Sequence, residues 1–461
     1  MLNLIKNEIY KIFHKKSTYI VLIITALFIT LVSYIISHDK IYTYMSSDMI
    51  YEVDSDDATL NKVNKEINEL YKDYNEDTWQ YFVMDKVYEI ITGYYYAKES
   101  NTLDNTILNN YNNAIKALKE DNWKYFVNLD INYYKEELKL NEEALKVAKS
   151  DKQKKEIEAQ IFTLKESIKV NEYRLNEDLK YGSNYLNNAI NTVLYSADSV
   201  KKYELADEKE EKAELESSVK EYHEAWYILD NKEDINNTSD LRYLLTNFYT
   251  EYIFLILVFG VMIAGSSVSE EINKGTIKSL LITPYKRRTI LLSKFITSIC
   301  LTVLFIIICY ILQIIIGGIF FGFSSLSNKV VEYNLVKGSI EVVSLFKYMV
   351  IYTLANLPLI LLLITLAFSI SAIVGNTALS IVVAFAGVIG STIINSFALI
   401  YKIDILKYFV TTNWDFNYYL FGGTSPYNTS LTHAIVVCII YFIIMIVTTF
   451  IIFTRKNIKN I

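Results

Sequence analysis

The chain has 461 residues, of which 52% are hydrophobic and 21% are charged, and the two kinds are segregated along the sequence. Residues 39–247 hold 43 of the 51 acidic but only 27 of the 45 basic residues, so this block has a net charge of −16 and the remainder has +10. Several apolar runs beside one long acidic block exclude a single soluble globular domain. The sequence contains no P-loop, HExxH or catalytic-triad pattern, and its three cysteines all lie in apolar runs. We therefore expect no catalytic residue, no metal site and no nucleotide-binding site of its own in this chain.

The first 17 residues predict an amphipathic helix lying at the cytoplasmic surface of a membrane. Its apolar positions form one stripe: Leu2, Ile5, Ile9, Ile12 and Phe13. The apolar run 18–36 follows directly and is long enough for a first transmembrane helix. A secretory signal peptide is the alternative interpretation, but the run is too long and residues 37–40 lack the small-x-small cleavage pattern.

Residues 37–247 predict an extracellular helical domain. The block contains no proline and only two glycines, Gly93 and Gly182, and it is rich in Lys, Glu, Leu and Tyr. This composition favours long helices over strands. A weak repeat, EDTWQYFV and EDNWKYFV, places Trp79 and Trp123 at equivalent positions. Two helices that pack these aromatic residues into one small core explain it most simply, and an aromatic ligand-binding surface is the alternative.

Within this domain, a helical hairpin with coiled-coil character is predicted at about 130–182. Apolar residues are spaced 4-3-4 along its second arm, at Ile157, Ile161, Leu164 and Ile168. This spacing is typical of a coiled coil, and the polar Asn171 in the same stripe can define its register. Ser150 and Gln153 form a capping-box pattern at the tip, and we expect Gly182 to end the second arm. One uninterrupted helix is the less favoured alternative.

Five further apolar runs predict a transmembrane domain over residues 248–453, giving six spans in total. The runs are 248–268, 295–320, 348–374, 376–400 and 434–453. An even number places both termini, including the tail 454–461, on one side. The segments on that side carry 13 basic residues, and the two short loops opposite carry five. The positive-inside rule therefore predicts cytoplasmic termini in a plasma-membrane protein whose block 37–247 lies outside.

The loop 270–294, EEINKGTIKSLLITPYKRRTILLSK, is short and basic but has the pattern of a folded segment. Thr276 can cap a short helix, on which Ile277, Leu280 and Leu281 share one face, and Pro284 would end it. An amphipathic helix held between two spans at the cytoplasmic face is a docking surface for a soluble partner.

The motif Glu-(x)3-Gly-Thr-Ile-Lys-x-Leu-Leu-(x)2-Pro-(x)2-Arg-Arg in this loop resembles the signature of ABC-2-type exporter permeases. The resemblance implies an all-α membrane protein with six transmembrane helices, in which the loop is the coupling helix that contacts a separate ATPase subunit. It further implies that ATP and Mg²⁺ bind to that ATPase, and that the permease pairs with a second copy or a related permease. By this resemblance the coupling residues are Glu271, Gly275, Thr276, Lys278, Leu280, Leu281, Pro284 and Arg287. The large extracellular insertion between the first two spans departs from the family pattern.

The expected function is therefore that of a permease subunit that exports a peptide, drug or lipid-like substrate through the bilayer. Glu251, Asn356 and Asn395 are polar residues in or beside the spans, and they are candidates for a translocation path. No feature predicts a nucleic-acid partner. The alternative is a non-transporting membrane protein with a helical ectodomain, similar to phage-receptor or secretion-accessory proteins. A carrier driven by ion gradients is disfavoured, because the spans contain few ionisable residues.

Overall fold

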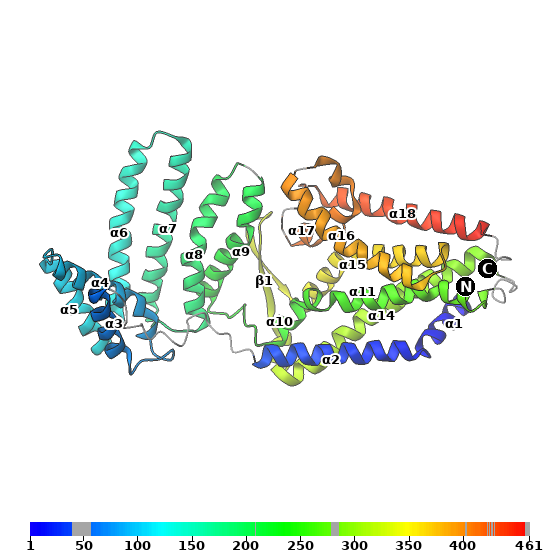
Figure 1. Ribbon diagram of the computed structural model, residues 1–461, viewed down its shortest axis with the longest axis horizontal. Helices are drawn as coiled ribbons and strands as arrows, with labels where there is room; N and C mark the ends of the chain where they lie inside the picture. Colours follow the sequence, from blue (N-terminus) through cyan, green and yellow to red (C-terminus); the bar gives the residue numbers. More distant parts are fainter. Residues whose placement is uncertain are drawn as a thin grey trace. The chain divides into compact units, whose positions relative to one another are not determined.

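A computed structural model describes residues 1–38, 57–207, 209–277, 285–401, 403–421, 423, 425, 427 and 429–456. The chain divides into two compact units (Figure 1). The membrane unit consists of residues 1–40 and 237–461, and the helical unit consists of residues 41–236. Regular structure in the described residues is almost entirely helical, as the composition predicts.

Six helices of the membrane unit are long and apolar enough to cross a bilayer, which confirms the predicted number of spans. They are α2 (Lys16–His38), α11 (Phe248–Ser267), α14 (Arg287–Phe321), α15 (Leu345–Ile373), α16 (Thr377–Tyr401) and α18 (Leu431–Arg455). The most buried of them is α11, which packs against α14, α15 and α16. Each span forms because a long apolar run satisfies its backbone hydrogen bonds within one helix.

Small residues on α11 permit this close packing. A Cβ atom added at Gly260 would lie 3.0 Å from Oγ1 of Thr302 on α14 and 3.1 Å from the Ile364 side chain on α15. Phe259, the residue before Gly260, stacks on Phe305 with ring centroids 4.0 Å apart. Small and flat side chains thus bring three spans together where apolar burial alone provides little force in lipid.

The start of α14 differs from the sequence-based expectation. We predicted residues up to Lys294 as part of a loop, yet α14 begins at Arg287. Its 35 residues make the helix about 52 Å long, whereas the hydrocarbon core of a bilayer is about 30 Å thick. The helix is therefore longer than one perpendicular crossing requires, and its first two turns carry the basic end of the predicted coupling segment.

A β-hairpin follows α14 and corrects the expectation of a purely helical chain. β1 (Lys329–Asn334) pairs antiparallel with β2 (Ser339–Ser344), and Lys329 lies opposite Ser344. The Asn334 side chain accepts hydrogen bonds from two N–H groups of the turn, and Gly338 takes φ +63°. Two short runs rich in β-branched residues, joined by a turn that contains a glycine, are the local cause, and the sequence analysis missed this signal.

The remaining short elements of the membrane unit lie at the ends of the spans. They are α1 (Leu2–Phe13), α10 (Leu241–Thr246), α12 (Ser269–Asn273), η2 (Ser324–Ser327), η3 (Asp404–Tyr408), η4 (Val410–Thr412) and α17 (Asn417–Leu420). The aromatic segment 409–420, which includes η4 and α17, packs on α15 and α16, and its Trp414 is buried.

In the helical unit, the repeated aromatic motif forms a core. Trp79, Trp123 and Phe126 are each buried, and the rings of Trp79 and Phe126 are 5.9 Å apart. The surrounding helices are α3 (Ala58–Tyr71), α4 (Met84–Glu99) and α5 (Asn105–Lys119), with η1 (Tyr81–Val83) between the first two. The packing interpretation of the repeat is thus confirmed.

Four longer helices complete the helical unit: α6 (Lys124–Val147), α7 (Asp151–Asn176), α8 (Tyr185–Leu205) and α9 (Lys209–Asn231). Each packs against the next, as Figure 1 shows. The ion pairs Lys135–Glu172 and Lys165–Glu142 show that α6 and α7 run antiparallel.

Two details of α7 depart from the sequence analysis. The helix ends at Asn176, and Asp178 takes φ +51°, so Gly182 does not end this arm. In addition, α7 buries a second face, including Ala159 and Val170, because it packs against α8 as well as α6. The predicted coiled-coil stripe, which would face a single neighbouring helix, accounts for only one of these two buried faces. The Ser150 hydroxyl accepts the N–H of Gln153 at 3.2 Å, which confirms the predicted cap.

Candidate functional site

Four charged side chains from three distant segments meet at one end of the membrane unit. They are Glu8 and Lys11 of α1, Glu271 of α12 and Lys294 of α14, and we call them the ion cluster. Nζ of Lys294 lies 3.0 Å from Oε2 of Glu8 and 2.8 Å from Oε1 of Glu271. Nζ of Lys11 lies 3.0 Å from the other Glu8 oxygen and 3.1 Å from Oε1 of Glu271.

Three of the four side chains in the ion cluster are largely shielded from water. The side chain of Lys294 is only 3% exposed, and those of Glu8 and Glu271 are 12% and 13% exposed. Burial by itself would raise the pKa of Glu8, but Lys294 and then Lys11 outweigh it and lower this pKa below 4.5. Burial also opposes the charged form of Lys11, yet Glu8 and Glu271 raise its pKa above 10.5. Glu8 and Lys11 are therefore charged throughout the neutral pH range.

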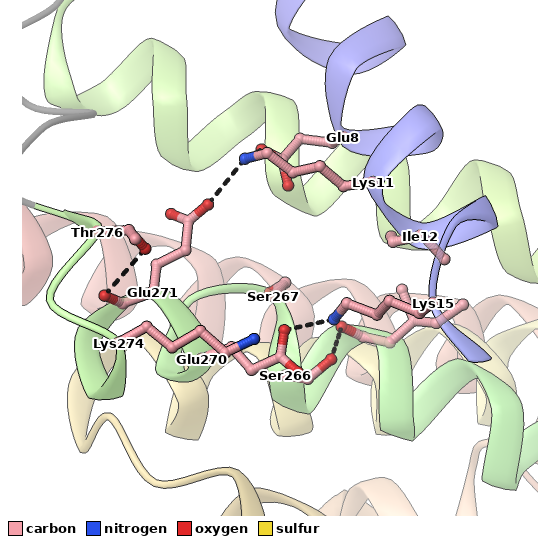
Figure 2. Close-up of a pocket in the computed structure, with 11 residues that line it drawn as sticks. Glu8, Lys11, Ile12, Lys15, Ser266, Ser267, Glu270, Glu271, Lys274 and Thr276 are labelled. Atoms are coloured by element: carbon pink, nitrogen blue, oxygen red, sulfur yellow. Dashed lines mark hydrogen bonds and ion pairs between the residues drawn. The ribbon is translucent and has the colours of Figure 1, made fainter. Parts of the chain in front are cut away.

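An open cavity of about 490 Å³ lies beside the ion cluster, between α1 and the junction of α11 and α12 (Figure 2). Lys15, which lies between α1 and α2, forms an ion pair with Glu270 across it. The hydroxyl groups of Ser266, Ser267 and Thr276 also line the cavity. Among the described residues, Oε2 of Glu271 is buried and accepts no hydrogen bond.

The break between α11 and α12 is held by a neighbouring span. Oγ of Ser371, on α15, accepts hydrogen bonds from the backbone N–H groups of Val268, at 3.3 Å, and Ser269, at 3.0 Å. The Ser269 hydroxyl lies 2.6 Å from that of Thr377, the first residue of α16. These bonds satisfy N–H groups that the helix break leaves without helical partners, and they position Glu270 and Glu271.

Arg287 connects the same end of α14 to α18. Its guanidinium group donates to the carbonyl oxygens of Thr454, at 3.4 Å, and Lys456, at 3.1 Å. Lys456 in turn donates to the carbonyl oxygen of Ile373, where α15 ends, at 2.9 Å. The basic residues at this end thus bind helix C-termini, whose carbonyl groups lack helical donors.

The structure describes half of the predicted coupling residues. Glu271 belongs to the ion cluster, and Gly275 takes φ +68° just after α12. The Thr276 hydroxyl donates to the carbonyl oxygen of Glu271 at 3.5 Å. The other four predicted residues, Lys278, Leu280, Leu281 and Pro284, lie outside the described residues, and so does the helix that Thr276 was expected to cap.

The three candidates for a translocation path lie on different helices. Glu251 is exposed in the first turn of α11. Asn356 donates to the carbonyl oxygen of Tyr352 in its own helix at 2.9 Å, and Asn395 donates to that of Thr411 at 3.1 Å. Within the described part of the chain, no hydrogen bond joins any two of the three.

Of the ion cluster, the sequence analysis predicted only Glu271 and missed Glu8, Lys11 and Lys294. The sequence does contain a signal for Glu8, because Glu8 is the only acidic residue among the first 38. Its partner Lys294 lies 286 positions away, and no local pattern predicts such a pairing.

Six apolar helices and a charged cluster at one end of the bundle define a multi-pass membrane protein. The chain belongs to the family described as "Protein of unknown function (DUF2705)", which matches residues 220–459. It is 29% identical to the "Uncharacterized protein YhcI" of Bacillus subtilis, over 54% of this chain and 82% of the relative. It is also 26% identical to the "Uncharacterized membrane protein YdbK" of the same organism, over 44% of this chain and 78% of the relative. No solved structure matches the chain.

Proposed function

We propose that this chain is the membrane-spanning permease subunit of an ATP-driven exporter. In this proposal, both termini and the ion cluster lie at the cytoplasmic face, and the helical unit lies outside. Two copies, or one copy and a related permease, pair with two ATPase subunits that bind ATP and Mg²⁺. The substrate is amphipathic, and peptides, drugs and lipid-like molecules all remain within the proposal.

The ion cluster is the observation that carries this proposal. Lys294 joins the first turns of α14 to Glu271 of α12, and Lys11 joins Glu271 to α1. The predicted coupling segment leads from α12 into α14, so a partner that moves it acts on both of its ends. Breaking a buried ion pair is costly, so the three elements are expected to move together rather than separately.

The chemistry of the cavity also supports a partner at this face. Lysine side chains (Lys11, Lys15 and Lys274) and the acidic side chains of Glu270 and Glu271 line it. Charged and hydrogen-bonding groups of both signs suit a polar protein surface and would orient a docked subunit. A purely lipid-embedded bundle does not require such an arrangement.

Substitution of Leu280 and Leu281 with Asp tests the proposal. Two carboxylates on the docking face should abolish co-purification of an ATPase with the full-length protein while leaving membrane insertion unchanged. Val336→Asp is the matched control, because Val336 is 80% exposed in the turn of the β-hairpin. This control should retain the ATPase.

Two results would contradict the assignment. Normal ATPase recovery with the double Asp variant would show that the segment is not the docking surface. Failure of any ATPase to co-purify with the wild-type chain from native membranes would favour the alternative, a non-transporting membrane protein with a helical ectodomain.

A further inference from the structure

Only three residues, Val374 to Asn376, link α15 to α16, and we call this link the α15–α16 turn. Gly375 takes φ +79° and donates its N–H to the carbonyl oxygen of Ser371, at 3.1 Å. The Asn376 side chain then accepts the N–H of Leu379 in the first turn of α16, at 3.0 Å. A glycine that ends one helix and an asparagine that caps the next let the chain pass directly from one span into the other.

The missing side chain at Gly375 is what lets α12 approach this turn. A Cβ atom added at Gly375 would lie 3.2 Å from Cδ1 and 3.3 Å from Cγ2 of Ile272, closer than ordinary van der Waals contact. Ile272 also packs against the apolar core of the membrane unit. Even the smallest side chain at Gly375 would therefore push Ile272 of α12 out of its place.

Buried hydrogen bonds join α12 to the helices on both sides of the turn. Ser371, in the last turn of α15, accepts the N–H of Ser269 at 3.0 Å. The Ser269 hydroxyl lies 2.6 Å from that of Thr377, where α16 begins. Ser269 and Ser371 are both fully buried, so separating them would leave polar groups without partners. A movement of α12 together with the turn costs less than a movement of α12 past it.

The other end of the predicted coupling segment reaches the same junction. Arg287, the first residue of α14, donates to the carbonyl oxygen of Lys456 at 3.1 Å. Lys456 donates to the carbonyl oxygen of Ile373, the last residue of α15, at 2.9 Å. Both ends of the segment are therefore connected to the end of α15, one directly through α12 and the other through Lys456.

We propose that α12 and the α15–α16 turn form one rigid body, in which Ile272 and Gly375 are positioning residues. A partner that moves the segment 270–294 then moves the ends of α15 and α16 with it, in addition to α1 and α14. This inference rests on the proposed function for the partner that supplies the movement, whereas the contact between α12 and the turn is a property of this chain alone.

A disulfide between Ile272→Cys and Gly375→Cys tests the proposal. The two Cβ atoms would lie 3.8 Å apart, close to the mean distance in disulfides. The full-length variant, purified with its ATPase, is oxidised either without nucleotide or after trapping with ATP and vanadate, and peptide mass spectrometry identifies the bond. We expect the bond to form at the same rate in both states. We also expect the bridged protein to retain its ATPase activity, and a reductant should not change that activity.

Two further variants make the test specific. Ile272→Cys with Leu379→Cys is the matched control, because Leu379 lies in the first turn of α16 but is 41% exposed. This pair should form little disulfide in either state. If Gly375→Cys prevents folding because of the positive φ, Ser269→Cys with Thr377→Cys tests the same rigid body, since the two native hydroxyl oxygens lie 2.6 Å apart.

Three results would overturn the rigid body. The first is a folded protein in which the disulfide does not form. The second is a roughly tenfold slower reaction in the trapped state, because the contact would then be populated only about a tenth of the time. The third is ATPase inhibition that a reductant reverses, since α12 would then have to slide past the turn. If no ATPase co-purifies with the wild-type chain, the proposed function fails instead, and disulfide formation in the chain alone still tests the contact.

Discussion

Replacing Lys294 with Met removes an ammonium group that lies between two buried carboxylates. Glu8 and Glu271, whose side chains are 12% and 13% exposed, would then have Lys11 as the remaining cation of the cluster. Removing one partner of a buried ion pair typically costs 3–5 kcal/mol. Because Lys11 stays within 3.1 Å of both carboxylates, we expect the lower end, about 3 kcal/mol. This corresponds to a fall of about 6–12 °C in Tm.

Thermal unfolding of the detergent-solubilised full-length protein measures this effect. Lys286→Met is the matched control, since Lys286 is exposed just before α14 and should change Tm little. The triple variant Lys294→Met, Glu8→Gln, Glu271→Gln removes the buried charges together and should recover most of the lost stability. If the triple variant were less stable than Lys294→Met alone, the argument that unpaired charge causes the loss would be refuted.

Two further predictions concern the same end of the membrane unit. Ser371→Ala leaves two backbone N–H groups at the α11–α12 break without their acceptor, and it should lower the unfolding free energy by about 1–3 kcal/mol. The same thermal unfolding assay measures this effect. An unchanged Tm would show that water replaces the hydroxyl. The lowered pKa of Glu8 gives a contribution to stability that is present above pH 4.5 and is lost as pH falls through the folded-state pKa. The raised pKa of Lys11 gives one that is present below pH 10.5 and is lost as pH rises through its folded-state value. Below about pH 4.5, the Tm of the wild type should therefore decrease more steeply with falling pH than the Tm of Glu8→Gln. Parallel curves of Tm against pH for the two proteins would contradict this role of Glu8.

The spans could be predicted from sequence because the bilayer imposes a length on every apolar run. Run lengths alone therefore predicted six spans. The N-cap at Ser150 was also predictable, because a hydroxyl and a nearby N–H group depend only on local sequence.

Features that depend on a distant partner could not be predicted in this way. The second buried face of α7 exists because α8 packs there, and the periodicity of α7 alone indicates one seam. Lys294 was counted as one more cation of a basic loop, although it is buried and paired with Glu8. Glu271 was identified through the motif, but its contact with α1 became visible only in three dimensions.

The membrane environment explains why charged pairs rather than apolar contacts fix the position of α1. Next to a membrane, an apolar contact gives a helix little reason to prefer protein over lipid, because the tails are as apolar as leucine. Charged pairs do distinguish one docking position from another, because carboxylate and ammonium groups that leave water need each other at a defined distance. The stripe of α1 can thus anchor the helix at the bilayer surface, whereas Glu8 and Lys11 select the one place along α12 and α14 where it docks.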